Sequence, residues 1–93
     1  MEYVWDEAKE RANLAKHGVK FTEAMLAFDD ADAIITPDSK HSQAEPRWWL
    51  LGKVNGRVLT VRYTEPRAGT RRIIGAGYWR KQAKIYEKIN PDN

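Results

Sequence analysis

RWWLLGKVNGRVLTVRYTE, at residues 47–65, is the stretch that decides the fold. Two runs rich in apolar, aromatic and β-branched residues flank Asn55 and Gly56, the dipeptide most typical of a two-residue β-hairpin turn. After the turn, apolar residues recur at every second position, as in a strand with one buried face. We therefore expect a hairpin with strands over residues 47–53 and 57–65.

The return strand is expected to have one buried face and one charged face. Leu59, Val61 and Tyr63 alternate onto the first face, which we assign to the core. Arg62 lies in the middle of the second face, with a threonine on each side of it along that face.

A third strand is expected over residues 71–76, after the turn sequence PRAGT. Simple alternation places Arg72 on one face with Ala76 and Arg71 on the other. Two or three arginines can then converge on one side of the sheet. Guanidinium groups suit phosphate oxygens because they donate paired hydrogen bonds. A half-exposed sheet face that simply carries charge would show the same pattern.

Glu45, Trp48 and Trp49, which lie just before or within the strand over residues 47–53, each have two explanations. Trp48 and Trp49 point to opposite faces, so both rings can pack in the core, or one can be left for a partner or a stacked base. Glu45 can act as a general base or can be the solvated partner of an arginine. His41 is expected to be an exposed loop residue.

The remaining segments predict helices on either side of the strands. Asp6 is an N-cap and Gly18 a left-handed C-cap for a helix between them. The further expected elements are a short strand over residues 3–5, a second helix over 23–28 capped by Thr22, a strand over 33–36, a polar loop over 37–46 and an amphipathic helix over 78–90. We therefore expect an α+β fold, one domain over residues 1–93, with N-terminal helices, an antiparallel sheet meander and a C-terminal helix.

The composition excludes several classes of protein. The 93 residues contain no cysteine, so a disulfide framework and a cysteine zinc site are excluded. There is no phosphate-binding glycine loop, no GxSxG and no HExxH pattern, and we expect neither a metal nor a cofactor. No apolar run is long enough for a membrane span, and we expect a cytoplasmic protein with no membrane partner.

The charge is divided unevenly along the chain. Residues 1–46 hold ten acidic and five basic side chains, a net charge of −5, whereas residues 47–93 hold eleven basic and three acidic ones, a net charge of +8. The C-terminal helix contributes a row of cations at helical spacing. A basic half favours a phosphate-bearing or acidic partner. The cations of the helix are Arg80, Lys81, Lys84 and Lys88.

Lys16 and His17 stand where the first helix is expected to end. Cations are favourable at that position because they interact with the negative end of the helix dipole. The same two side chains would also suit a reactive site, as a cation and a proton-transfer group.

Taken together, these motifs resemble the BrnT-type toxins of bacterial toxin–antitoxin pairs. The similarity runs end to end and is most specific in VWDEAKERANLAKHGV, residues 4–19, and in the 45–65 hairpin. It implies a RelE-like fold and a metal-independent ribonuclease that cleaves RNA and inhibits translation and growth. It also implies neutralisation by a BrnA-type antitoxin, with operator DNA bound only through the antitoxin.

In such an enzyme the ribose 2′-hydroxyl attacks the adjacent phosphate, which requires a base and donors for the developing charge. Glu45 or His17 is a candidate base. The candidates for stabilising charge are Lys16, Arg62 and Arg72, with Arg80 positioning the backbone. The further candidates for RNA binding are Arg71, Lys81, Lys84 and Lys88.

One departure from the family pattern raises an alternative. The family's third strand usually ends in Ile-Ile-Ser-Ala-Arg, but residues 73–77 of this chain read Ile-Ile-Gly-Ala-Gly. If the missing arginine stabilises charge during cleavage, the chain would be a catalytically weak or inactive module that binds an antitoxin and co-represses its operon.

Overall fold

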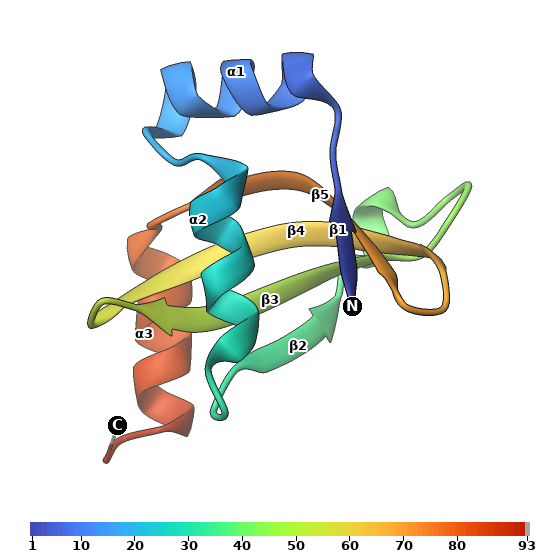
Figure 1. The fold of residues 1–93 in the computed structure, drawn as a ribbon. Helices are drawn as coiled ribbons and strands as arrows, with labels where there is room; N and C mark the ends of the chain where they lie inside the picture. The colour runs from blue at the N-terminus through green and yellow to red at the C-terminus, as the bar shows by residue number, and fades with distance from the viewer. Residues whose placement is uncertain (93) are drawn as a thin grey trace.

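The computed structural model describes residues 1–92, and a five-stranded sheet forms its centre (Figure 1). The strand order is β1-β5-β4-β3-β2. Strands β2 to β5 form an antiparallel meander, and β1 joins its edge in parallel to β5. The strands are β1 (Glu2–Val4), β2 (Ile34–Pro37), β3 (Arg47–Val54), β4 (Arg57–Arg67) and β5 (Thr70–Gly77).

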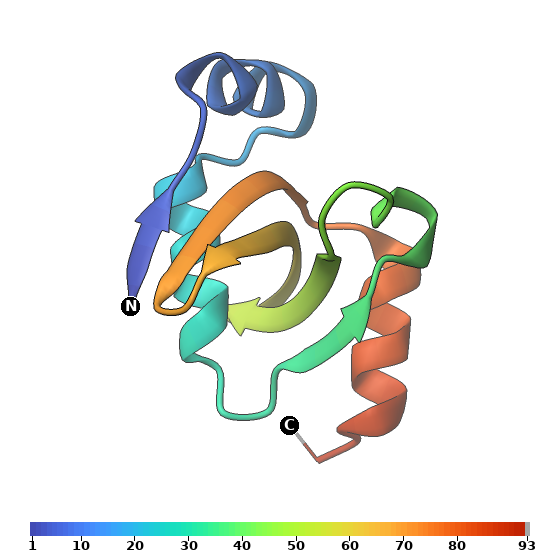
Figure 2. The same cartoon turned by 90° about the vertical axis from the view of Figure 1, so that its right-hand side faces the viewer.

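The helices lie on both faces and along one edge of this sheet (Figures 1 and 2). One face is covered by α2 and the short 3₁₀ helix η1, and the other face by α3. The first helix, α1, lies along β5. The helices are α1 (Glu7–His17), α2 (Phe21–Leu26), η1 (Ala27–Asp29), η2 (Ser39–His41) and α3 (Arg80–Ile89). The expected α+β arrangement of N-terminal helices, meander and C-terminal helix is confirmed.

The two faces carry two separate apolar clusters. Leu59, Val61 and Tyr63 are buried in the larger cluster, beneath α2, as predicted. On the other face, Tyr86 of α3 is buried in a smaller cluster with Val58. Trp48 packs against the larger cluster and Trp49 against the smaller one, so both tryptophans are partly buried, one on each face.

Local capping explains where the N-terminal helices begin and end. The carboxylate of Asp6 accepts a hydrogen bond from the backbone N–H of Lys9, and Gly18 takes the left-handed conformation with φ of 71°. Both predicted caps are therefore confirmed. The prediction that Thr22 caps α2 was wrong: the helix begins at Phe21, whose N–H donates to the side chain of Glu10 at 2.9 Å.

A buried asparagine joins α1 to the edge of β5. The side-chain nitrogen of Asn13 donates to the carbonyls of Val19 and Ala76, at 3.0 and 2.9 Å. Its side-chain oxygen accepts from the N–H of Ala76 at 3.1 Å. Strand β1 pairs with β5 only as far as Arg72. Beyond that point the Asn13 amide therefore makes the hydrogen bonds that a neighbouring strand would otherwise make.

An irregularity in β5 changes which arginines share a face. Arg62 pairs with Gly75, but the next residue, Tyr63, pairs with Ile73, so Ile74 is an extra, bulged residue. Arg72 pairs with Thr64 and so lies on the face of Arg62. The prediction that Arg72 shares a face with Ala76 was wrong, because simple alternation does not account for a bulge.

Candidate functional site

The helix α3 covers only one end of its sheet face. In Figure 1, α3 lies beside the β3–β4 turn, whereas the loop after β2 lies toward the opposite end of the strands. The strand register places two rows of residues on this face between them: Trp49 pairs with Arg62, and Thr64 pairs with both Arg47 and Arg72. We call this group the arginine face; it consists of Arg47, Trp49, Arg62, Thr64 and Arg72.

Arg62 is held by a buried carboxylate and an aromatic ring. Its guanidinium group lies 3.4 Å from Oδ2 of Asp38, and its centre lies 5.4 Å from the ring of Trp49. A quarter of the Arg62 side chain is exposed, whereas that of Asp38 is 6% exposed. The arginine is therefore fixed in place with part of its charge facing solvent.

Asp38 also binds the imidazole of His41. Nδ1 of His41 lies 3.1 and 3.0 Å from the two carboxylate oxygens of Asp38. Half of the His41 side chain remains exposed. Burial by itself would raise the pKa of Asp38, but hydrogen bonds from His41 and Trp49 and the charges of His41 and Arg62 hold it below its usual value. Asp38 is therefore an ionised acceptor shared by three side chains, those of His41, Trp49 and Arg62.

Sequence reasoning missed this pair. Asp38 was not singled out, and His41 was expected to be simply exposed. The signal in the sequence was the spacing between these two residues. Asp38 directly precedes the short helix η2, and His41 lies three residues later. Side chains three residues apart on a helical turn can meet.

Trp79 connects the arginine face to the end of α1. Its ring lies 6.2 Å from that of Trp49 and 5.2 Å from that of His17, measured between centroids. A Cβ atom added to Gly77 would lie 2.4 Å from the Trp79 ring. The tryptophan therefore fills the space that a side chain at position 77 would need.

The other candidates from the N-terminal half, Lys16 and Glu45, both lie next to β5. Lys16 is exposed at the end of α1 and lines a shallow hollow with His17 and Ile74. Glu45 lies 3.2 Å from Arg72, so its carboxylate is part of an ion pair.

Arg71 lies away from the other candidates. Its guanidinium group packs over the rings of Phe28 and Tyr63 on the α2 side of the sheet, and it donates to the hydroxyl of Tyr3 at 2.9 Å. The structure therefore does not bring Arg71 together with Arg62 and Arg72.

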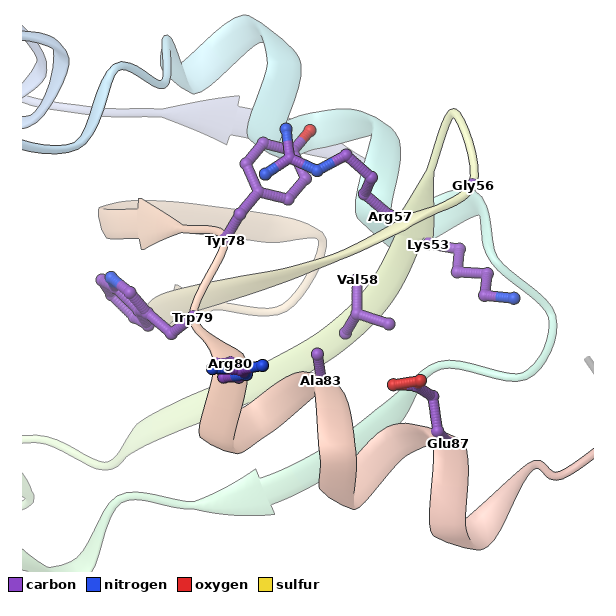
Figure 3. A pocket seen from close by; sticks show the side chains of 9 residues that line it. All are labelled: Lys53, Gly56, Arg57, Val58, Tyr78, Trp79, Arg80, Ala83 and Glu87. Atoms are coloured by element: carbon purple, nitrogen blue, oxygen red, sulfur yellow. The ribbon is translucent and has the colours of Figure 1, made fainter.

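The cations of α3 form a separate exposed row. Arg80, Lys81, Lys84 and Lys88 are exposed, and among residues 1–92 none of them forms an ion pair. Arg80 also lines a pocket between α3 and the β3–β4 turn, shown in Figure 3.

That pocket is mainly basic and is also lined by Trp79. Lys53 and Arg57 line it together with Arg80, against the single carboxylate of Glu87 (Figure 3). The guanidinium group of Arg57 lies 4.0 Å from the ring centre of Tyr78. Burial, together with the hydroxyl's hydrogen bond to Glu23, raises the pKa of Tyr78 to about 12, so this ring stays neutral at physiological pH.

The part of the chain that the structure describes holds no candidate metal centre and no candidate membrane-spanning helix. Residues 1–92 contain no group of three or more histidine, aspartate or glutamate side chains placed to hold a metal ion. No helix in the same part of the chain is long and apolar enough to span a membrane.

Comparison with known proteins gives a consistent family assignment. The model of the family described as "Ribonuclease toxin, BrnT, of type II toxin-antitoxin system" matches residues 5–83. The crystal structure of the Brucella abortus ribonuclease toxin BrnT is similar, with 27% identity and a TM-score of 0.69 over 85% of this chain and 96% of that one. Curated protein sequences give no match. Because the family model spans most of the chain and the two folds agree, this chain belongs to the BrnT family of ribonuclease toxins of type II toxin–antitoxin systems.

Proposed function

We propose that this chain is a metal-independent endoribonuclease that cleaves RNA on the arginine face and thereby inhibits translation and growth. The observation that carries the proposal is the placement of Arg62 and Arg72 on one open sheet face, with Arg62 fixed by Asp38 and Trp49. Fixed guanidinium groups stabilise the charge that develops on a phosphate during attack by the 2′-hydroxyl, and such preorganised stabilisation is usually the largest part of catalysis.

The residues around the arginine face have distinct proposed roles. Trp49 and Trp79 offer ring surfaces for bases, since base stacking on aromatic side chains tolerates any sequence. Lys16 and the α3 cations bind the RNA backbone through its phosphates. The proposed backbone-binding residues are Lys16, Arg80, Lys81, Lys84 and Lys88.

The test uses purified wild-type chain, total RNA and EDTA. We expect cleavage without divalent metal, products that end in a 2′,3′-cyclic phosphate, and no cleavage where the attacking 2′-hydroxyl is replaced by hydrogen. Replacing Arg62 and Arg72 together by glutamine should abolish cleavage. The matched control is Arg67→Gln, because Arg67 lies on the same strand but is 68% exposed and pairs with Glu2 away from the site. Intact RNA with the wild-type chain would refute the proposal.

We further propose that a cognate BrnA-type antitoxin covers the arginine face and α3, and that operator DNA is reached only through the antitoxin. An acidic, amphipathic segment complements this surface, and covering it would exclude RNA sterically. The antitoxin and a non-cleavable RNA should therefore compete in a binding assay. A stable ternary complex of toxin, antitoxin and RNA would contradict this mode of inhibition.

A second candidate function rests on Gly77 and Trp79. The aromatic ring fills the space next to position 77, where the family pattern has an arginine, so the chain would be a weak or inactive ribonuclease that acts as a binding and co-repressing partner. A purified chain that binds its antitoxin tightly but leaves RNA intact at high concentration would favour this function.

A further inference from the structure

We propose that His41, oriented by the buried carboxylate of Asp38, is the general base that activates the ribose 2′-hydroxyl, an assignment that rests on the proposed ribonuclease function. Neither of the base candidates suggested by the sequence, Glu45 and His17, has an equivalent arrangement. Glu45 is paired with Arg72, and the ring of His17 packs nearly perpendicular to that of Trp79.

The geometry fixes the protonation pattern of the imidazole. Both oxygens of Asp38 lie within 3.1 Å of Nδ1 of His41, and an ionised carboxylate can only accept hydrogen bonds. The proton of the neutral imidazole is therefore held on Nδ1, and the lone pair is on Nε2. The carboxylate also stabilises the imidazolium that forms when Nε2 takes a proton.

The loop that carries the pair is held at several points. The backbone N–H of Asp38 donates to the carbonyl of Arg47 at 2.8 Å. The hydroxyl of Ser42 donates to the carbonyl of Asp38 at 2.7 Å and accepts from the N–H of Arg47 at 2.9 Å. These bonds connect both ends of the loop to β3, so the imidazole is presented from a fixed backbone.

His41 is placed next to the group that would bind the phosphate. Oδ2 of Asp38 lies 3.0 Å from Nδ1 of His41 and 3.4 Å from Arg62, so one oxygen atom joins the two side chains. A phosphate bound by Arg62 would bring the neighbouring ribose to the imidazole. The charged groups facing His41 are Asp38 and Arg62 on one side and, around the adjoining hollow, Lys40, Glu45 and Arg47.

The proposed step balances without a metal or cofactor. Nε2 of His41 takes the proton of the 2′-hydroxyl while the 2′-oxygen forms a bond to phosphorus. The bond from phosphorus to the 5′-oxygen breaks, leaving a 2′,3′-cyclic phosphate. The leaving 5′-oxygen takes a proton from water, and the resulting hydroxide takes the proton from the imidazolium, which restores His41.

The experiment measures single-turnover cleavage of an RNA substrate by wild-type, His41→Gln and Gln43→Ala chains across pH. Gln43→Ala is the matched control, because Gln43 is an exposed residue of the same loop and cannot transfer a proton. A general base typically contributes 100-fold or more, so we expect His41→Gln to lower the rate by about 100-fold or more and Gln43→Ala to leave it unchanged. The wild-type rate should rise with pH as its general base loses its proton, and this rise should be absent in His41→Gln.

A second variant, Asp38→Asn, tests the positioning role. The amide can donate to Nδ1 and so favours the tautomer with the proton on Nε2, which would lower the rate and displace the pH profile; ¹⁵N spectra of the imidazole would report the tautomer directly. If wild-type cleavage persists in His41→Gln with an unchanged pH profile, this assignment is overturned but the ribonuclease function stands. If the wild-type chain cleaves no RNA, both are overturned.

Discussion

At the level of single side chains, Asn13 makes the most consequential contacts outside the site. It is buried, and its three hydrogen bonds satisfy both backbone groups of Ala76 and the carbonyl of Val19. Asn13→Ala would leave all three without that partner, and each unsatisfied buried group costs about 1–3 kcal/mol. We expect the free energy of unfolding to fall by about 3 kcal/mol or more in urea denaturation.

The matched control for Asn13→Ala is Asn90→Ala. The Asn90 side chain makes one hydrogen bond to the carbonyl of Asp32 at an exposed position, so its loss should change the free energy of unfolding by about 0.5 kcal/mol or less. Equal effects of the two substitutions would contradict the role of Asn13 as a substitute for a neighbouring strand.

Gly77 gives a second prediction about a single residue. A methyl group at this position would lie within 2.6 Å of three Trp79 ring atoms, so Gly77→Ala should displace the ring and lower the free energy of unfolding by about 1–3 kcal/mol. Tryptophan fluorescence would report the displacement. In a Trp79→Ala background the same substitution should have little effect, because the obstructing ring is gone.

Gly75→Ala is the control for Gly77→Ala, because a Cβ atom at position 75 would meet only Asn13 Oδ1, at 3.6 Å. A comparable disturbance from Gly75→Ala would show that the strand end as a whole, rather than the Trp79 contact, is sensitive.

The limits of sequence-based prediction are clearest at these residues. The left-handed Gly18 and the capping Asp6 were predictable because helix ends impose local rules. The His41–Asp38 pair and the Asn13 contacts were not, because they depend on which loops and edges the folded sheet brings together. Of the six candidate catalytic residues, the structure places only Arg62 and Arg72 on the arginine face itself.

Among the secondary-structure elements, the packing of η1 against β3 depends on a glycine. A Cβ atom on Gly52 would lie 2.3 Å from the backbone carbonyl oxygen of Ala27, which cannot move aside as a side chain can. Gly52→Ala should therefore force η1 away from the sheet and lower the free energy of unfolding by about 3 kcal/mol or more. Thermal and urea denaturation would measure the loss, and wild-type stability in this variant would refute the close contact.

The hairpin illustrates what the sequence predicts about elements. Asn55 and Gly56 both have positive φ and connect β3 to β4 in the expected register, because a two-residue turn fixes the pairing of its strands. The bulge at Ile74 had no such local signal. It became visible only in the pairing of β4 with β5, yet it decides that Arg72 lies with Arg62.

For the protein as a whole, two aspartates make stability depend on acid pH. Burial would raise the pKa of Asp30, but hydrogen bonds from the backbone of Lys53 and from the Tyr86 hydroxyl hold it below the usual value, and Asp38 behaves similarly. The carboxylates of Asp30 and Asp38 therefore bind protons less readily in the folded state than in the unfolded state. The resulting stability is complete above the unfolded pKa of about 4 and is lost as pH falls through the lower, folded pKa.

We therefore expect the free energy of unfolding to fall below about pH 4, and Asp30→Asn to flatten that fall. The matched control is Asp29→Asn, because Asp29 is the exposed neighbour in the chain. Urea denaturation between pH 2 and 7 measures both. An identical pH dependence in Asp30→Asn and wild-type chains would contradict this origin of acid sensitivity.

We expect the uneven charge of the chain to set how its RNA affinity depends on salt. The basic C-terminal half places exposed cations along α3, and each phosphate neutralised by a cation contributes about −0.7 to the slope of log affinity against log salt for single strands. Replacing Arg80, Lys84 and Lys88 together by glutamine should therefore make the slope less negative by about 2, if each binds one phosphate. The measurement is fluorescence anisotropy with a non-cleavable RNA at several salt concentrations. The matched variant replaces three exposed cations of the acidic half, Lys9, Arg11 and Lys20, by glutamine and so removes the same net charge. An equal change of slope in both variants would mean that overall charge, rather than the α3 row, governs RNA binding.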